Sequence, residues 1–227
     1  TTVLTVPYTY KVLYDEHVLQ ATAWCMHQTR TVGTIVRGYP IEGVFTALYS
    51  YLDTRPCFYP FLVSLLHDLT GFREGNAFAL NTMLMPVALG LFYLLVRRLC
   101  HHAAARAAFL ALGGLSLRAQ NAASAGMEMR NLTMLIFAMH LAAHYLGRPD
   151  DRSLTALILG AVLLAQTRYE SGFYVLPVAV IVLAGWRCRG RLLLPAAAML
   201  APALLIPCAL QNTYLSGTPM LWELREN

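Results

Sequence analysis

Residues 75–98 read GNAFALNTMLMPVALGLFYLLVRR, a run that carries no charge until it ends at two arginines. About 20 apolar residues in a helix cross the hydrocarbon core of a bilayer, so this run predicts a membrane-spanning helix. Similar runs follow it along the chain. They are residues 107–117 continuing past Arg118 to 127, then 131–147, 153–167, 171–186 and 192–210.

The composition points the same way. Hydrophobic residues make up 57% of the chain and charged residues only 13%, and a single soluble core does not bury so many apolar runs. We therefore predict an all-α fold, a polytopic transmembrane helical bundle of about six helices across residues 76–210. The shortest runs lie near the lower length limit for a span.

Charges sort by side when the runs are threaded alternately through a membrane. Three short loops then share one side and hold eight arginines, opposed only by Asp150 and Asp151, so the positive-inside rule makes that side cytoplasmic. The other ten acidic residues fall on the opposite side. This sorting explains the pI of about 9.1 and makes nucleic acid a poor candidate partner. The eight are Arg97, Arg98, Arg106, Arg148, Arg152, Arg187, Arg189 and Arg191.

Both ends of the chain are predicted to hold extracytoplasmic segments. Residues 1–75 are expected to hold the end of a first membrane helix and a long outer loop with juxtamembrane helices. Residues 211–227 are expected to lead into a missing C-terminal part, so the chain is interpreted as a fragment. Within the first loop, helices are predicted over 16–29 and 44–52, with a turn at 38–40. An interfacial helix is predicted from Pro56 to about Gly71.

Acidic and basic residues cluster at the predicted outer ends of the helices. Asp15 and Glu16 follow the presumed first helix, and an acid there can accept a proton from an acceptor molecule. Glu128 and Arg130 flank the start of a span, where charges are costly unless paired or used. Arg168 and Glu170 repeat the pattern. The alternative interpretations are a solvated loop for the acids and a snorkelling Arg130.

Arg55 stands before Pro56 at the start of the interfacial helix. A guanidinium beside the free N–H groups of a helix N-terminus can hold a phosphate. A solvated loop arginine is an equally good interpretation of this feature alone.

As an ordered set, these motifs resemble the membrane glycosyltransferases of the GT-C fold, nearest to the protein mannosyltransferase and lipid A aminoarabinose transferase group. The set comprises the Asp15–Glu16 pair, the long outer loop, Arg55-Pro56-x-x-Tyr59-Pro60, the Leu-Leu-Val-Arg-Arg ending of the first run, and Glu128-x-Arg130. The resemblance covers about residues 11–175.

The resemblance implies a GT-C-like enzyme of the cell envelope that takes its sugar from a polyprenyl-phosphate donor. The acceptor would be a glycan, lipid or protein, and the active site would lie on the extracytoplasmic face of the plasma membrane, among membrane lipids. Asp15 matches the catalytic acid of the family and Glu128 a second acidic position. Arg55 and Arg130 match residues that would contact the donor phosphate, with Glu16, Asp53, Tyr59, Arg168 and Glu170 as supporting residues.

One departure from the pattern bears on cofactors. Where the aminoarabinose branch has Glu before the basic residue, this chain has Thr54, with Asp53 one step earlier. The sequence therefore allows a divalent metal as a cofactor but does not require one. The competing interpretation is a non-catalytic membrane protein, either a transporter or an assembly subunit. A transporter is expected to hold charged or helix-breaking residues near mid-span. Here the ionisable residues gather at the outer ends, and Arg118, His140 and Pro86 are the main interior exceptions.

Overall fold

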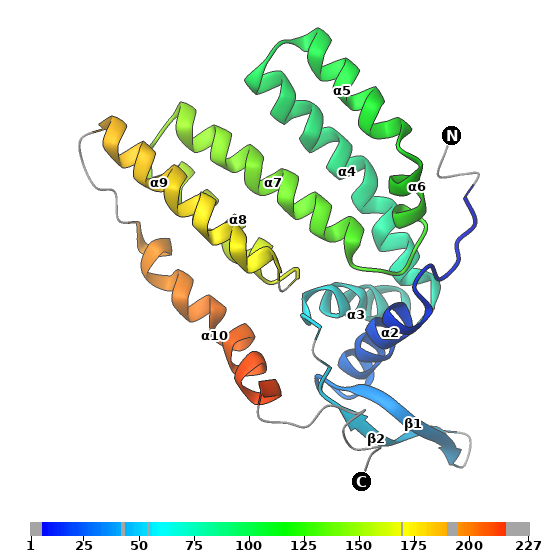
Figure 1. Ribbon diagram of the computed structural model, residues 1–227. Coiled ribbons are helices and arrows are strands. Elements are labelled where there is room, and N and C mark those ends of the chain that lie inside the picture. Colours follow the sequence, from blue (N-terminus) through cyan, green and yellow to red (C-terminus); the bar gives the residue numbers. More distant parts are fainter. Residues whose placement is uncertain (1–5, 42–43, 54, 169, 190–194, 217–227) are drawn as a thin grey trace.

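The computed structural model describes residues 6–41, 44–53, 55–168, 170–189 and 195–216. These residues are mostly helical, with one two-stranded hairpin (Figure 1). The elements are α2 (Leu13–Gln28), β1 (Thr34–Ile41), β2 (Val44–Tyr51), α3 (Phe58–Thr70), α4 (Gly75–Leu99), α5 (His102–Gly114), α6 (Ser116–Ala122), α7 (Glu128–Gly147), α8 (Asp151–Ala165), the 3-10 helix η1 (Glu170–Tyr174), α9 (Val175–Arg189) and α10 (Ala196–Ser216).

The longer helices run up and down side by side, and α2, α3 and the hairpin gather at one end of them (Figure 1). At the other end lie the turn from α4 to α5 and the turn from α7 to α8. Arg97 and Arg98 lie in the last turn of α4, Arg148 lies between α7 and α8, and Arg152 lies at the start of α8. The arginine-rich turns therefore share one end, as the alternate threading requires.

Two buried clusters of apolar side chains pack these helices together. Leu19 and Ala23 of α2 pack against Tyr59 and Val63 of α3, together with Ala77 at the start of α4. A second cluster joins α4, α6 and α7 around the small residues Ala88 and Ala122. The amide of Asn81 in α4 donates to the backbone oxygens of Ser124 at 2.8 Å and Gly126 at 2.7 Å. These bonds fix the segment that leads into α7.

Large apolar side chains remain exposed on the outer faces of several helices. Exposed examples are Met83, Val87 and Leu94 of α4, Leu110 of α5, and Val180 and Leu183 of α9. Apolar surface this extensive marks contact with a membrane or a partner. Among the described residues, two helical stretches are long and apolar enough to cross a bilayer, Gly75–Leu99 and Glu170–Arg187.

The predicted helices at 16–29 and from Pro56 to Gly71 are confirmed as α2 and α3. The predicted helix over 44–52 and the turn at 38–40 are wrong: β1 pairs antiparallel with β2 there, with Thr34 opposite Tyr51 and Ile41 opposite Val44. Both segments are rich in β-branched and aromatic residues, which favour strands. The fold is therefore not purely α-helical.

The predicted span over 107–127 is also interrupted. Leu115 is extended after Gly113 and Gly114, which are poor helix formers, so α5 ends and the short α6 begins. Arg106 lies within α5 and not in a loop. At the C-terminal end, α10 continues through residues 211–216, and the remainder of the predicted outer segment, 217–227, lies outside the described residues.

Candidate functional site

Asp15, Asp53 and Arg55 form one polar cluster where α2 meets the segment between β2 and α3. Nη1 of Arg55 donates to both carboxylate oxygens of Asp53, at 2.9 and 3.0 Å, and its Nη2 donates to Oδ1 of Asp15. The backbone N–H of Arg55 also donates to Asp53 at 3.2 Å. Thr54, between them, lies outside the described residues. The structure therefore joins the predicted base to the predicted phosphate ligand.

Exposure differs across this cluster. The side chain of Asp15 is 45% exposed, that of Arg55 17% and that of Asp53 9%. Burial lowers the pKa of Arg55, but the hydrogen bonds and negative charges of Asp53 and Asp15 outweigh it and raise that pKa overall. Asp53 thus holds the guanidinium in place, while Asp15 keeps a face open to solvent.

Two tyrosines that the sequence did not single out complete this cluster. The Arg55 guanidinium lies 5.7 Å from the ring centre of Tyr14. Burial, a hydrogen bond with Tyr14 and the charge of Asp53 raise the pKa of Tyr51. Their positions in the sequence could have indicated them, since Tyr14 precedes Asp15 and Tyr51 stands two residues before Asp53 at the end of β2.

Arg130 lies in the first turn of α7 and is 1% exposed. Its Nη2 donates to the backbone oxygen of Thr167 at 2.5 Å, and its guanidinium lies 4.8 Å from the ring centre of Phe58 and 5.8 Å from that of Tyr59. Nε and Nη1 have no hydrogen-bond partner within the described part of the chain. Buried charged donors without partners are costly, and this cost makes Arg130 a residue to explain in the site.

Glu16 and Glu128 approach each other over Gly126. A Cβ atom placed on Gly126 would lie 2.2 Å from an oxygen of Glu128 and 3.5 Å from an oxygen of Glu16. Glu16 is 2% exposed and accepts hydrogen bonds from the backbone N–H groups of Lys11, Val12 and Ala125. Glu16 therefore holds α2 against the start of α7, and Glu128 is the more accessible of the two acids.

Tyr59 packs beside Arg130 at the start of α3. It is almost fully buried, and its hydroxyl donates to the backbone oxygen of Ala77 at 3.3 Å. Burial raises the pKa of Tyr59, the charge of Arg130 opposes that rise, and the charges of Glu16 and Glu128 add to it. Tyr59 is thus a packed residue that positions Arg130.

Arg168 and Glu170 pair with each other, with Nε of Arg168 at 3.3 Å from Oε2 of Glu170. Tyr169 lies outside the described residues. The neighbouring Thr167 donates its hydroxyl to Oδ1 of Asn131 at 2.6 Å, and Ser171 donates to the same oxygen at 2.9 Å. These bonds tie the end of α8 to the start of α7, and the oxygen of Thr167 also receives Arg130.

The predicted residues thus fall into neighbouring groups. Arg55 joins Asp15 and Asp53, Glu16 and Glu128 both lie near Gly126, and Arg130 packs on Phe58 and Tyr59. Arg168 and Glu170 pair separately. Within the described ranges, no three His, Cys, Asp or Glu side chains gather as metal ligands.

Comparisons with protein families, curated proteins and solved structures found no significant match to this chain.

Proposed function

We propose that this chain carries the active site of a membrane glycosyltransferase, which transfers a sugar with inversion from a polyprenyl-phosphate donor to an acceptor on the extracytoplasmic face. The observation that carries the proposal is the direct contact between Asp15 and Arg55. It places a solvent-facing acid next to a guanidinium that suits a phosphate.

The buried Arg130 adds a second phosphate ligand. Its unpartnered Nε and Nη1 offer donors that a phosphate oxygen can accept. Phe58 packs against it from the start of α3, whose exposed Phe61 and Leu65 would suit contact with a polyprenyl chain. Arg55 and Arg130 would thus hold the donor from two sides of the same helix start.

The reaction follows from these positions. Asp15 takes the proton of an acceptor hydroxyl or amine as the acceptor atom attacks the anomeric carbon. The bond between that carbon and the phosphate oxygen breaks, and the polyprenyl phosphate leaves with the electron pair. Arg55 and Arg130 stabilise the negative charge on the leaving group. A phosphate leaves readily, so no strong general acid is needed.

Donor binding also changes the contact between Arg55 and the base, Asp15. In the structure, Asp15 shares Arg55 with Asp53. A phosphate that bonds to Arg55 competes with Asp15 for Nη2, while Asp53 keeps its two bonds to Nη1. The donor therefore frees the Asp15 oxygen that Arg55 holds, so both carboxylate oxygens become available to the acceptor.

The exposed apolar faces of α4, α5 and α9 support placing these helices in a membrane. The basic turns at the end opposite the site support an extracytoplasmic location for Asp15 and Arg55. The competing candidate is an assembly subunit, and the contact between Asp15 and Arg55 is what supports the enzyme over it.

The test is a transfer assay with full-length protein in membranes and a radiolabelled polyprenyl-phosphate sugar. We expect loss of label from the lipid, release of polyprenyl phosphate, and an inverted anomeric configuration in the product. Donor that stays intact with glycan, lipid and peptide acceptors alike would contradict the proposal.

A further inference from the structure

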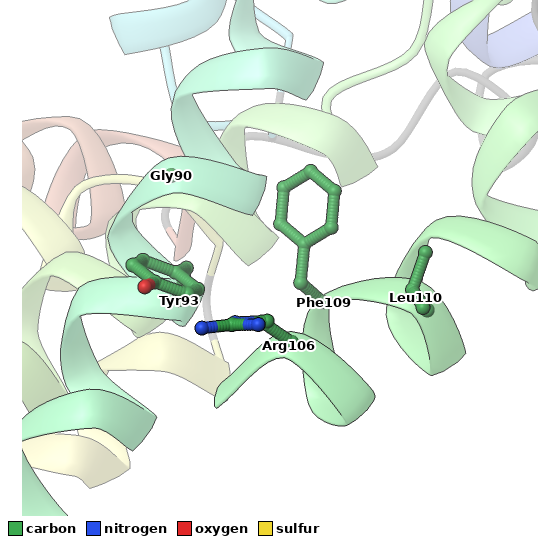
Figure 2. Close-up of a pocket in the computed structure, with 5 residues that line it drawn as sticks. All are labelled: Gly90, Tyr93, Arg106, Phe109 and Leu110. Atoms are coloured by element: carbon green, nitrogen blue, oxygen red, sulfur yellow. The ribbon is translucent and has the colours of Figure 1, made fainter. Parts of the chain in front are cut away.

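A pocket of about 400 Å³ lies between α4 and α5, away from the candidate site and toward the basic end of the bundle. Gly90 and Tyr93 of α4 line one wall, and Arg106, Phe109 and Leu110 of α5 line the other (Figure 2). Pockets that hold small ligands generally occupy about 300–1,000 Å³. This pocket is therefore large enough for part of a lipid.

The interior of the pocket is apolar. A Cβ atom on Gly90 would meet nothing within 4 Å, so the glycine leaves open space along α4. The rings of Tyr93 and Phe109 meet edge to face at 6.5 Å from the two walls, and Leu110 on the α5 wall is 71% exposed. An aliphatic chain would find apolar contacts along this wall.

A free cation lies beside this apolar space. Figure 2 shows the side chain of Arg106 reaching from α5 toward Tyr93. No ion pair or hydrogen bond within the described residues occupies its guanidinium, and the Tyr93 hydroxyl is already 3.3 Å from Nδ1 of His102. Arg106 is thus available to an anion.

The positions of Arg106 and of the apolar space near Gly90 along the helices match the phosphate and the acyl chain of a lipid. Gly90 lies seven residues before Arg97, which is roughly 10 Å along a helix, and Arg106 lies one turn into α5. Residues 97–114 contain arginines and histidines but no acid. The cation therefore lies near the basic end and the apolar space lies deeper, as the phosphate and acyl chain of a cytoplasmic-leaflet lipid would.

We propose that this pocket binds an anionic phospholipid, with its phosphate on Arg106 and an acyl chain against Gly90, Phe109 and Leu110. The inference rests on the membrane placement in the proposed function and is independent of the transfer reaction. It adds a lipid site at the end opposite Asp15.

The test is native mass spectrometry of the full-length protein, equilibrated in mixed micelles with phosphatidylglycerol or phosphatidylcholine. We expect preferential retention of phosphatidylglycerol, unchanged by added inorganic phosphate. Arg106→Gln removes the cation and Gly90→Leu fills the open space, and each is expected to reduce retention about tenfold. Arg97→Gln and Gly113→Leu are matched controls outside the pocket, since Gly113 also has open space.

Equal retention of the two lipids, or unchanged retention in both pocket variants, would overturn the inference. Melting curves check that Gly90→Leu folds, and Arg106→Gln tests the site without any added bulk. A protein that does not fractionate with membranes would refute the membrane placement itself. A protein that fractionates with membranes and transfers sugar, yet shows no lipid preference, would refute only this site.

Discussion

Arg55 forms an ion pair with Asp15, a residue forty positions earlier in the chain. The same guanidinium bonds Asp53 through its other terminal nitrogen. One arginine therefore links the first turn of α2 to the entry of α3, and it leaves Asp15 as the exposed member of the cluster.

Replacing Arg55 with Gln is expected to weaken binding of a polyprenyl phosphate by about 10- to 100-fold, because charge-assisted hydrogen bonds contribute roughly 1.5–3 kcal/mol. Arg55→Lys should restore little of this, because a single ammonium cannot bond Asp53 and a phosphate in the same fork. The measurement is lipid-phosphate affinity in detergent. Arg73→Gln, an exposed arginine after α3, is the control, and unchanged affinity in Arg55→Gln would remove Arg55 from the donor site.

Arg130→Met should separate binding from stability. The guanidinium is buried with two unpartnered nitrogens, so an apolar side chain of similar size is expected to maintain or raise the melting temperature while donor affinity falls at least tenfold.

Arg118→Met is the matched control for that change. Arg118 is also buried, and none of its three side-chain nitrogens has a hydrogen-bond partner in the part of the chain that the structure describes. It lies on α6, so its replacement should raise stability without changing donor affinity. A large loss of stability in Arg130→Met, with donor affinity intact, would show that Arg130 is structural.

Gly126→Ala tests the placement of Glu128. The added methyl group would lie 2.2 Å from a Glu128 oxygen, at the end of a flexible side chain, so the carboxylate must move while the fold accommodates the change. We expect transfer to fall about tenfold, a typical cost of misplacing a group near the chemistry, with a small change in melting temperature. Gly75→Ala, with nothing within 4 Å, is the control. Full activity in Gly126→Ala would show that transfer does not depend on the position of the Glu128 carboxylate.

His67 should make the packing of α3 sensitive to pH. Burial and the nearby His27 lower the pKa of His67 below its ordinary 6.5, although Asp68 opposes this. The unfolded chain therefore binds a proton there more readily than the folded protein. The contribution of His67 to stability is fully present above about pH 6.5 and is lost as the pH falls below that value.

The melting temperature in detergent, measured from about pH 7.5 down to about pH 5, checks this expectation. The fall should be shallower in His67→Gln than in the wild-type protein. Equal slopes in His67→Gln and in the wild-type protein would contradict the assignment.

Helical segments with regular apolar spacing were predictable from the sequence. The runs 75–96 and 131–147 lie in α4 and α7, and α3 ends at Gly71, whose φ of 80° suits glycine. The hairpin was not predictable as a pair, because Val44–Tyr51 has apolar residues that fit either period and only its pairing with Thr34–Ile41 selects a strand.

In the candidate site, too, single residues were predictable from the sequence and their contacts were not. Asp15 and Arg55 were identified individually from their positions at helix ends, but their contact depends on how α2 packs on α3. The approach of Glu16 to Glu128 depends on Asn81, whose amide fixes the 124–126 backbone from the neighbouring helix. No local pattern encodes contacts across so many residues.

The most direct test of the account is transfer of sugar from a polyprenyl-phosphate donor by the Asp15→Asn variant of the full-length protein, with Asp151→Asn at the opposite end as control. We expect Asp15→Asn to lose transfer by about 10²–10⁴-fold, as removal of a general base does, while it still binds polyprenyl phosphate through Arg55 and Arg130. Transfer at the wild-type rate in Asp15→Asn would contradict the account.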